Sequence, residues 1–352
     1  MIHKINRRQT LGILGASALL STASSIKATD YSDLNTDRYL GEVDVLATIE
    51  DDKVFTEGPA WGNGALYFTN VPAGKILKWD GRKLSVYREN SNHANGLHFD
   101  SAGNLWACEG GGRSVSGKPK LVRAACVTRT DWKSGEITVL ASEFNSFPLA
   151  SPNDLCFDYK NRLFFSSRPG GVDATKGNVN AVYRLDPDGS LEQVLAWPDI
   201  HMPNGLVTSP NGRKLYLIEA HPDAEHHRDI RSYEITEDGK LMDEKIVIDF
   251  YPGRSGDGMA IDVKGNLYVA AGLHATRKTS ETLDTKPGIH VISPQGKILA
   301  FRETPEATIT NCTFGGKNLK TLFVTCGTKL LAIPTRISGK STFLRKINGI
   351  SR

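Results

Sequence analysis

Cysteine is scarce in this sequence, and the motifs of several enzyme classes are missing. There are five cysteines, an odd number, and none forms a Cys-x-x-Cys pair, so a complete set of intrachain disulfides is excluded. Cys108 with Cys126 is the one pair to test as a disulfide. No Gly-x-Ser-x-Gly elbow occurs and no Ser-x-x-Lys follows residue 28, so no motif supports a serine nucleophile.

An excess of charge of either sign is also missing once the N-terminal segment is set aside. The chain of 352 residues has 43 Lys and Arg against 39 Asp and Glu. Residues 1–28 hold four of the basic residues and no acidic one, so the remainder carries 43 − 4 = 39 basic and 39 acidic side chains. This balance gives no electrostatic reason to expect nucleic acid or an anionic membrane as a partner.

The first 28 residues have the organisation of an export signal. Lys4 precedes the segment 7–11 (RRQTL), which matches a twin-arginine signal, and residues 11–26 are mildly apolar and too short to span a bilayer comfortably. The segment 26–28 (IKA) is a passable cleavage site, which puts the start of the mature chain near Thr29. We therefore expect an exported, periplasmic protein, with an uncleaved anchor or a Sec substrate as the alternatives.

The remainder of the chain has neither a membrane-spanning stretch nor a visible domain boundary. No later segment is long and apolar enough to cross a bilayer, and no Pro/Ser/Gly-rich linker divides the chain. Closed β architectures of this length often form one domain. We expect residues 29–352 to be a single domain and the protein to be a monomer.

One short block recurs along this remainder. A polar head opens an apolar run, and a turn and a second β-rich run follow, as in residues 257–269 (DGMAIDVKGNLYV). The six heads are Glu57, Asn95, Asn153, Asn204, Asp257 and Asn311. From Asn95 to Asn311 they are 58, 51, 53 and 54 residues apart. Six copies of an all-β unit of this size predict a closed ring of antiparallel sheets, a six-bladed β-propeller.

The heads suggest a metal site in the central channel of this propeller. If each head begins the innermost strand of its blade, six polar side chains converge on the channel. Two are carboxylates and four are carboxamides, hard oxygen donors that suit Ca²⁺ or Mg²⁺ better than soft metals. The alternative is that Asn-Gly and Asp-Gly are separate turn formers. Six heads in register, two of them acidic, favour the channel site.

Three further segments have weaker patterns. Residues 43–49 predict a strand that closes the ring by pairing with the segment 322–333, so the blades extend over residues 43–333. The tail, residues 339–352, is basic and has no evident role. His221, His226 and His227 lie in a polar segment, where a solvated loop is favoured over a zinc site.

The repeat blocks resemble those of the senescence marker protein (regucalcin)/gluconolactonase/luciferin-regenerating enzyme family. The resemblance rests on the segments 57–61 (EGPAW), 151–154 (SPND), 203–206 (PNGL), 255–259 (SGDGM) and 311–316 (NCTFGG). It implies a six-bladed propeller with one divalent metal ion in the channel, calcium being expected and zinc, manganese or magnesium the alternatives. It also implies a hydrolase that opens a small-molecule lactone, such as a sugar lactone.

The resemblance assigns roles to individual residues. Glu57, Asn204 and Asp257 are the implied metal ligands, and Asp257 is also the implied catalytic acid/base. Metal-dependent hydrolysis would use the ion to polarise the lactone carbonyl and Asp257 to move the proton of the attacking water.

Substrate binding is less closely matched. Asn153 falls on the family's asparagine that approaches substrate, and the head Asn95 and Arg168 are further candidates for substrate binding. Ser151 stands where regucalcin-like members carry arginine, and no glutamate in residues 168–180 matches their substrate-contacting glutamate. These departures concern the identity of the lactone. A non-catalytic ligand-binding propeller with a structural metal remains an alternative, as does a lyase or quinone-dependent dehydrogenase on the same fold.

Overall fold

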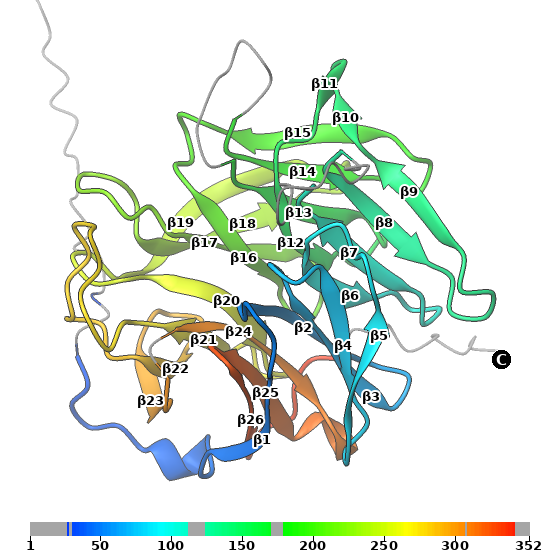
Figure 1. Cartoon of the computed structure of the whole chain (residues 1–352). Coiled ribbons are helices and arrows are strands. Elements are labelled where there is room, and N and C mark those ends of the chain that lie inside the picture. The colour runs from blue at the N-terminus through cyan, green and yellow to red at the C-terminus, as the bar shows by residue number, and fades with distance from the viewer. Residues whose placement is uncertain (1–26, 28–29, 112–123, 170–178, 307, 342–352) are drawn as a thin grey trace, which may run out of the picture.

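A computed structural model describes residue 27 and residues 30–111, 124–169, 179–306 and 308–341 of the chain. Six four-stranded antiparallel sheets form a ring, so the prediction of an all-β six-bladed propeller is confirmed (Figure 1). The innermost strands of successive blades contact one another around the whole ring, from β2 through β6, β12, β16, β20 and β24 back to β2. Among the described residues, no helix is long and apolar enough to cross a membrane.

Each blade runs from an inner to an outer strand. From first to sixth, the blades are β2 (Thr56–Gly62), β3 (Ala65–Asn70), β4 (Lys75–Trp79) and β5 (Leu84–Arg88); β6 (Ala94–Phe99), β7 (Leu105–Glu109), β8 (Cys126–Thr130) and β9 (Ile137–Ala141); β12 (Pro152–Phe157), β13 (Leu163–Ser167), β14 (Ala181–Leu185) and β15 (Leu191–Ala196); β16 (Pro203–Thr208), β17 (Lys214–Glu219), β18 (Asp229–Ile235) and β19 (Leu241–Asp249); β20 (Gly256–Ile261), β21 (Leu267–Ala271), β22 (Gly288–Ile292) and β23 (Ile298–Glu303); β24 (Ile309–Gly315), β25 (Thr321–Cys326), β26 (Lys329–Pro334) and β1 (Asp44–Thr48). Outside the blades lie the hairpin β10 (Glu143–Phe144) and β11 (Phe147–Pro148) and the 3₁₀ turns η1 (Thr36–Arg38) and η3 (Lys317–Leu319).

The sixth blade is built from both ends of the described chain. β1 pairs antiparallel with β26, with Asp44 opposite Ala332 and Thr48 opposite Lys329. The expected closing strand is therefore confirmed, and β1 lies beside β26 in Figure 1. This pairing gives the sixth blade four strands like the others and ties the two ends of the described chain together.

Turns inside the blades follow from the repeated Asp-x-x-Gly pattern. After β20, Asp262 Oδ1 accepts hydrogen bonds from the backbone N–H groups of Lys264 (2.8 Å) and Asn266 (2.9 Å). Gly265 takes a φ of 84°, a left-handed value that most side chains disfavour. The aspartate therefore holds the turn that returns the chain into the next strand.

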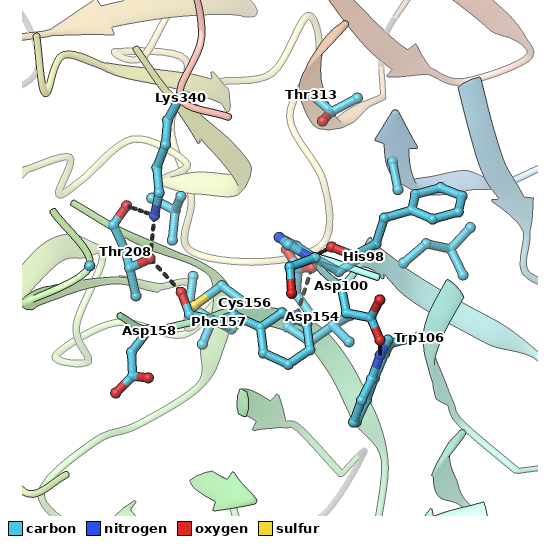
Figure 2. A pocket seen from close by; sticks show the side chains of 18 of the residues that line it. His98, Asp100, Trp106, Asp154, Cys156, Phe157, Asp158, Thr208, Thr313 and Lys340 are labelled. Carbon is cyan, nitrogen blue, oxygen red and sulfur yellow. Dashed lines mark hydrogen bonds between the residues drawn. The ribbon is translucent and has the colours of Figure 1, made fainter. Parts of the chain in front are cut away.

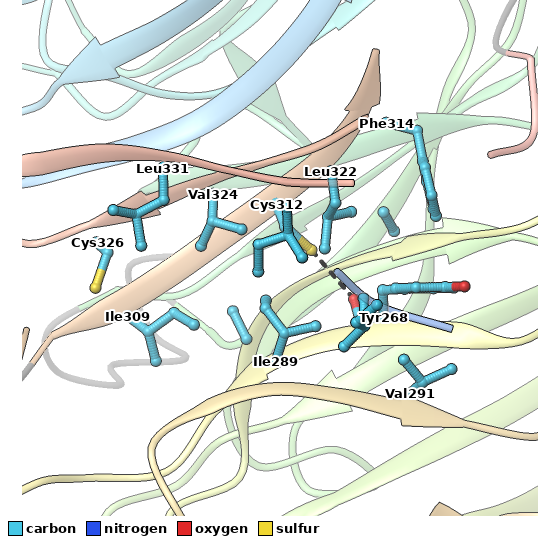
Figure 3. Close-up of a cluster of buried hydrophobic side chains, with 14 of the residues drawn as sticks. Tyr268, Ile289, Val291, Ile309, Cys312, Phe314, Leu322, Val324, Cys326 and Leu331 are labelled. Atoms are coloured by element: carbon cyan, nitrogen blue, oxygen red, sulfur yellow. Dashed lines mark hydrogen bonds between the residues drawn. The ribbon is translucent and has the colours of Figure 1, made fainter. Parts of the chain in front are cut away.

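The apolar core lies between neighbouring blades. All six residues of β3 are buried, whereas the outer strand β9 is largely exposed. Between the fifth and sixth blades, Tyr268 and Val291 pack against Leu322 and Val324, with Cys312 in the same cluster (Figure 3). Since each sheet buries both faces of its inner strands, the blade sequences read as continuous apolar runs.

The cysteines contribute to this core as thiols. All five are buried, and no disulfide joins Cys108 to Cys126, so that candidate pairing is wrong. In the ladder between β7 and β8, Cys108 lies opposite Val127 and Cys126 lies opposite Glu109. Because successive side chains of a strand point to opposite faces, the two thiols lie on opposite faces of the sheet.

Candidate functional site in the central channel

The polar heads lie at the start of the inner strands, where the strand pairing is irregular. The register with the second strand shifts at every head, between Glu57 and Ala60, Ala94 and Leu97, Pro152 and Leu155, Pro203 and Leu206, Gly256 and Met259, and Ile309 and Asn311. An extra residue of this kind breaks the alternation of a strand and redirects a side chain. The heads therefore belong to bulged strands, and the interpretation of Asn-Gly and Asp-Gly as separate turn formers is wrong.

Glycines beside the heads allow neighbouring inner strands to approach closely. A Cβ on Gly58, whose φ is 50°, would lie 2.0 Å from the carbonyl oxygen of Asn95 in the next blade. A Cβ on Gly258 would lie 2.0 Å from Cγ of Asn311. Neither distance leaves room for a side chain, so glycine is required for the heads to form a tight ring. In the third blade this position holds Asp154.

Asp257 is the most connected head. Its Oδ1 accepts a hydrogen bond from Nδ2 of Asn204 at 2.5 Å, and its Oδ2 pairs with Nη2 of Arg254 at 2.6 Å. Nη1 of Arg168 lies 3.9 Å from Oδ1. Arg254 is buried and also donates to the carbonyl oxygen of Ile309 at 3.1 Å. This arrangement fixes the orientation of the carboxylate and turns Oδ1 toward Asn204 and Arg168.

Glu57 and Asp154 bring two more carboxyl groups to the same region. Glu57 is 3% exposed, and its Oε2 accepts the N–H of Gly58 at 3.0 Å. Burial, followed by the negative charges of Asp257 and Asp154, raises the pKa of Glu57 well above its ordinary value.

Asp154 has a milder perturbation. It accepts the N–H of Leu155 at 2.9 Å and Nδ2 of Asn311 at 3.3 Å. Burial raises the pKa of Asp154 to about 6 despite these two hydrogen bonds, and the charge of Asp257 adds to the rise. The channel therefore gathers three carboxyl groups, and burial with mutual repulsion disfavours the charged form of Glu57 and of Asp154.

The predicted substrate-binding residues make fewer side-chain contacts with the heads than the predicted metal ligands do. Asn153 is buried and Asn95 is partly buried, and among the described residues no side-chain hydrogen bond connects either to another head. Arg168 follows β13, and its backbone N–H donates to the carbonyl oxygen of Ser151 at 3.0 Å. Its Nη2 lies 3.4 Å from Sδ of Met202, so the guanidinium reaches toward Asp257 from the rim.

The histidine-rich segment packs around a fourth histidine. Nδ1 of His226 lies 3.2 Å from Nδ1 of His201, and the rings of His201 and His227 stack with centroids 3.9 Å apart. Desolvation lowers the pKa of His201 to about 4. In the part of the chain that the structure describes, no group of three or more His, Cys, Asp or Glu side chains is arranged to hold a metal ion, either in this segment or in the channel.

The sequence of residues 55–328 matches the family described as the SMP-30/Gluconolactonase/LRE-like region. This match covers well over half of the chain. The protein belongs to the SMP-30/gluconolactonase/LRE-like family.

Known members of the family support this assignment in sequence and in fold. A protein named gluconolactonase from Zymomonas mobilis is 27% identical over 324 residues, covering 84% of this chain and 82% of the relative. The structure of a protein from Xanthomonas campestris, titled as a gluconolactonase, is 27% identical with a TM-score of 0.66, covering 85% of this chain and 91% of that one. A calcium-binding regucalcin from Agrobacterium tumefaciens, at 16% identity, 86% and 95% coverage and a TM-score of 0.63, shares the fold.

The donor set in the channel fits a hard divalent ion. Glu57 and Asp257 supply carboxylates, and Asn204 donates to Asp257 through its nitrogen, which keeps its amide oxygen for an ion. The raised pKa of Glu57 points the same way, because a bound cation would relieve the repulsion from Asp257 and Asp154. These three ligand candidates include only two carboxylates and no histidine or cysteine.

Sequence reasoning missed two residues of the site and gave a third no role. The residue that follows the head is glycine in four of the six blocks, whereas Asp154 stands there in the third. This acidic residue in place of glycine could have identified Asp154 as a site residue from the sequence. Asn311 was recognised as a head but was given no role, although it hydrogen-bonds to Asp154. Arg254 lies in the coil before β20, where nothing in the sequence distinguishes it from a solvated arginine.

Proposed function

We propose that this protein is a metal-dependent lactone hydrolase that acts on a sugar lactone, in the manner that the names of its gluconolactonase relatives indicate. The observation that carries the proposal is the setting of Asp257, a buried carboxylate held by Arg254 and Asn204 at the end of the channel. Fold alone would not distinguish an enzyme from a binding protein.

Glu57, Asn204 and Asp257 are the residues that would hold the divalent ion. Their oxygen donors suit calcium, with magnesium, manganese or zinc as alternatives. When bound, such an ion polarises the lactone carbonyl and stabilises the negative charge that develops on its oxygen.

Asp257 supplies the proton transfer. Arg254 holds Oδ2 in an ion pair, whereas Oδ1 accepts from the neutral amide of Asn204 and faces the partly exposed Arg168, so Oδ1 is the atom that would take the proton as water attacks the carbonyl carbon. The ring C–O bond then breaks, and the same proton passes to the departing alkoxide, which leaves as a hydroxyl group. The product is an open hydroxy acid, and Asp257 returns to its starting state.

The remaining candidates orient the substrate. The guanidinium of Arg168 approaches Oδ1 of Asp257 from a partly exposed position, where it can donate to a hydroxyl or carbonyl oxygen of the lactone. Asn153 and Asn95 carry amides beside the other heads and are the further candidates for contacts to sugar hydroxyls. Because Ser151 cannot supply a second guanidinium here, the enzyme should prefer lactones without an additional negative charge.

The test is hydrolysis of glucono-1,5-lactone and a panel of smaller lactones by the mature protein, followed through proton release. We expect turnover that is lost with a chelator and restored by Ca²⁺ or another divalent ion. Asp257→Asn should lower kcat by roughly 10²- to 10⁴-fold, the usual contribution of a general acid/base. The exposed Asp52→Asn is the matched control and should behave as wild type.

Two outcomes would redirect the proposal. If no lactone is hydrolysed while a divalent ion still raises the Tm of wild type but not of Asp257→Asn, the channel would be a metal site in a ligand-binding protein. If turnover survives complete removal of divalent ions, the metal-dependent reaction is wrong.

We also propose that residues 1–28 direct export to the periplasm and that residues 29–352 act as a monomeric single domain. Residues 1–26, 28 and 29 lie outside the described part of the chain. The support is the twin-arginine segment at residues 7–11. Replacing Arg7 and Arg8 together by lysine should keep the protein in the cytoplasmic fraction, and unchanged periplasmic recovery would contradict the twin-arginine route.

A further inference from the structure

The central channel has a second compartment beyond the ring of heads. A cavity of about 610 Å³ is lined by the inner-strand residues that follow the heads, by residues of the further strands of the second and third blades such as Arg129 and Leu185, and by Lys340. Glu57, Asn204 and Asp257 do not line it. Asp154 and Asn311 do, and their hydrogen bond of 3.3 Å lies between this cavity and the candidate active site.

The C-terminal segment brings Lys340 into this compartment. Its backbone is fixed by hydrogen bonds from Gly339 N to Leu319 O (2.8 Å) and from Lys340 N to Ile261 O (2.9 Å). The side chain then reaches the fourth blade, where Nζ donates to the carbonyl oxygen of Thr208 at 2.9 Å and to its hydroxyl at 2.5 Å (Figure 2). The expectation that the tail from residue 339 has no evident role is therefore wrong for its first residues.

Lys340 brings a positive charge that nothing nearby neutralises directly. Among the described residues, Lys340 forms no ion pair, and its two hydrogen-bond acceptors on Thr208 are neutral oxygens. Asp158 lies close enough to interact weakly, but it is already paired with Arg162 at 2.6 Å. Burial lowers the pKa of Lys340 to about 8, which still leaves the ammonium form in the majority at neutral pH.

The rest of the wall is partly apolar, and besides Lys340 it carries Arg129 and four aspartates, Asp100, Asp154, Asp158 and Asp186. Leu97, Phe157 and Met259 line the cavity from three different blades. His98 also lines it, but desolvation lowers the pKa of His98 to about 4, so its ring is neutral. Exposed turn residues, among them Ala102, form part of the lining, so the cavity opens to solvent. Volume and lining fall within the usual range of sites for small organic molecules.

We propose that this compartment binds a small amphipathic monocarboxylate, with its carboxylate on Nζ of Lys340 and its apolar body along the inner strands. One ammonium group balances one negative charge, and a buried charge needs such a partner. The four aspartates of the lining outnumber its two cations, Lys340 and Arg129, so a dianion would meet more repulsion than a monoanion. The site is thus distinct from the one proposed for lactone hydrolysis.

Calorimetric titration of the mature protein with octanoate tests the proposal, with octanol and octyl phosphate as neutral and dianionic analogues. We expect saturable binding of octanoate and weaker binding of both analogues. Lys340→Met should weaken octanoate binding by about 10- to 100-fold, the effect of losing a hydrogen bond to a charged group. The exposed Lys278→Met is the control and should bind as wild type.

A second readout does not depend on the folding of a variant. Acetylation of wild-type lysines by an activated ester, followed by mass spectrometry, should be slowed at Lys340 and not at Lys278 when octanoate is present. At ten times the Kd only about one site in eleven is empty, so protection of roughly tenfold is expected.

Binding at the other compartment must be separated from binding here. Asp257→Asn and Arg168→Met should leave octanoate affinity unchanged, whether or not the protein proves to be a lactonase. The proposal is overturned if octanoate does not bind saturably, if it protects no lysine, or if its affinity depends on Asp257 or Arg168 and not on Lys340.

Discussion

Replacement of Asp154 by asparagine should stabilise the protein when no divalent ion is present. The pKa of Asp154 is raised from 3.8 to about 6 by burial and by the charge of Asp257. A shift of about two units corresponds to roughly 3 kcal/mol of unfavourable free energy for the ionised form. The fold carries this penalty at neutral pH, and Asp154→Asn removes it.

Part of this gain is offset by altered hydrogen bonds. Asp154 accepts from the backbone of Leu155 and from the amide of Asn311, and an asparagine keeps only one side-chain oxygen for them. Losing one such bond costs about 1 kcal/mol. The expected net gain in the free energy of unfolding is therefore about 2 kcal/mol at pH 7.5.

The gain in stability from Asp154→Asn should depend on pH, in the direction set by the raised pKa of Asp154. An acid whose pKa is higher in the folded state binds extra protons there between pH 3.8 and about 6, so it loses stability as pH rises through that window. The advantage of Asp154→Asn should be present above pH 6 and should disappear near pH 4. Urea unfolding in chelator at several pH values measures it, with Asp52→Asn as the control.

Calcium should reduce the difference between Asp154→Asn and wild type, because a cation at Glu57 and Asp257 would compensate the crowded negative charge. The reasoning is refuted if Asp154→Asn is less stable than wild type at pH 7.5 in chelator. It is also refuted if the gain stays the same from pH 8 to pH 4, since a titrating carboxyl could not be its origin.

Three further substitutions test the packing of the ring and the support of the site. Gly258→Ala places a Cβ 2.0 Å from Cγ of the buried Asn311 and should lower the free energy of unfolding by about 1–3 kcal/mol, measured by urea titration. Gly110→Ala is the control, because the nearest neighbour of its Cβ would be 3.4 Å away, and it should be close to neutral. Leu331→Ala, at a fully buried position between the last two blades, should cost about 2–5 kcal/mol, and a loss below 1 kcal/mol by calorimetry would mean that this core is poorly packed. Arg254→Met leaves Asp257, the proposed catalytic carboxylate, without its buried partner and should lower the free energy of unfolding by about 3–5 kcal/mol. It should also lower kcat for lactones more than it changes KM, and an effect on KM alone would indicate a substrate contact instead.

Sequence periodicity was sufficient to predict the ring because each blade repeats one local pattern. The heads recur before apolar runs of similar length, and the first and last segments of a propeller often share a blade, which predicts closure by the segment 43–49. What the pattern could not show is the bulge at each head, since a register shift depends on how two strands meet. The Asn-Gly pairs resemble turns in the sequence for the same reason that they suit bulges, which is the absence of a side chain beside the head.

The residues of the candidate site likewise fall into two groups, those inside the repeated blocks and those in irregular segments. Glu57, Asn204 and Asp257 could be recognised as heads because they occupy equivalent positions in repeated blocks, and the family resemblance then singled them out as metal ligands. Arg254 and Lys340 could not, because each reaches the channel from an irregular segment outside the repeat. The ion pair of Arg254 and the insertion of Lys340 depend on where those segments lie in the finished ring, which no short-range pattern encodes.

The pairing of β1 with β26 in the sixth blade has a consequence for how the protein folds during its synthesis. Asp44 pairs with Ala332, 288 positions later, so this contact has one of the longest sequence separations in the chain. Bringing two such points together in a flexible chain carries an entropic cost of about 5 kcal/mol before any contact repays it. During synthesis the earlier blades can form one after another, but the ring cannot close until the last strand has left the ribosome. A chain that ends before Lys329 would keep the inner strands of its sixth blade without their outer partners, so ring closure distinguishes complete chains from truncated ones.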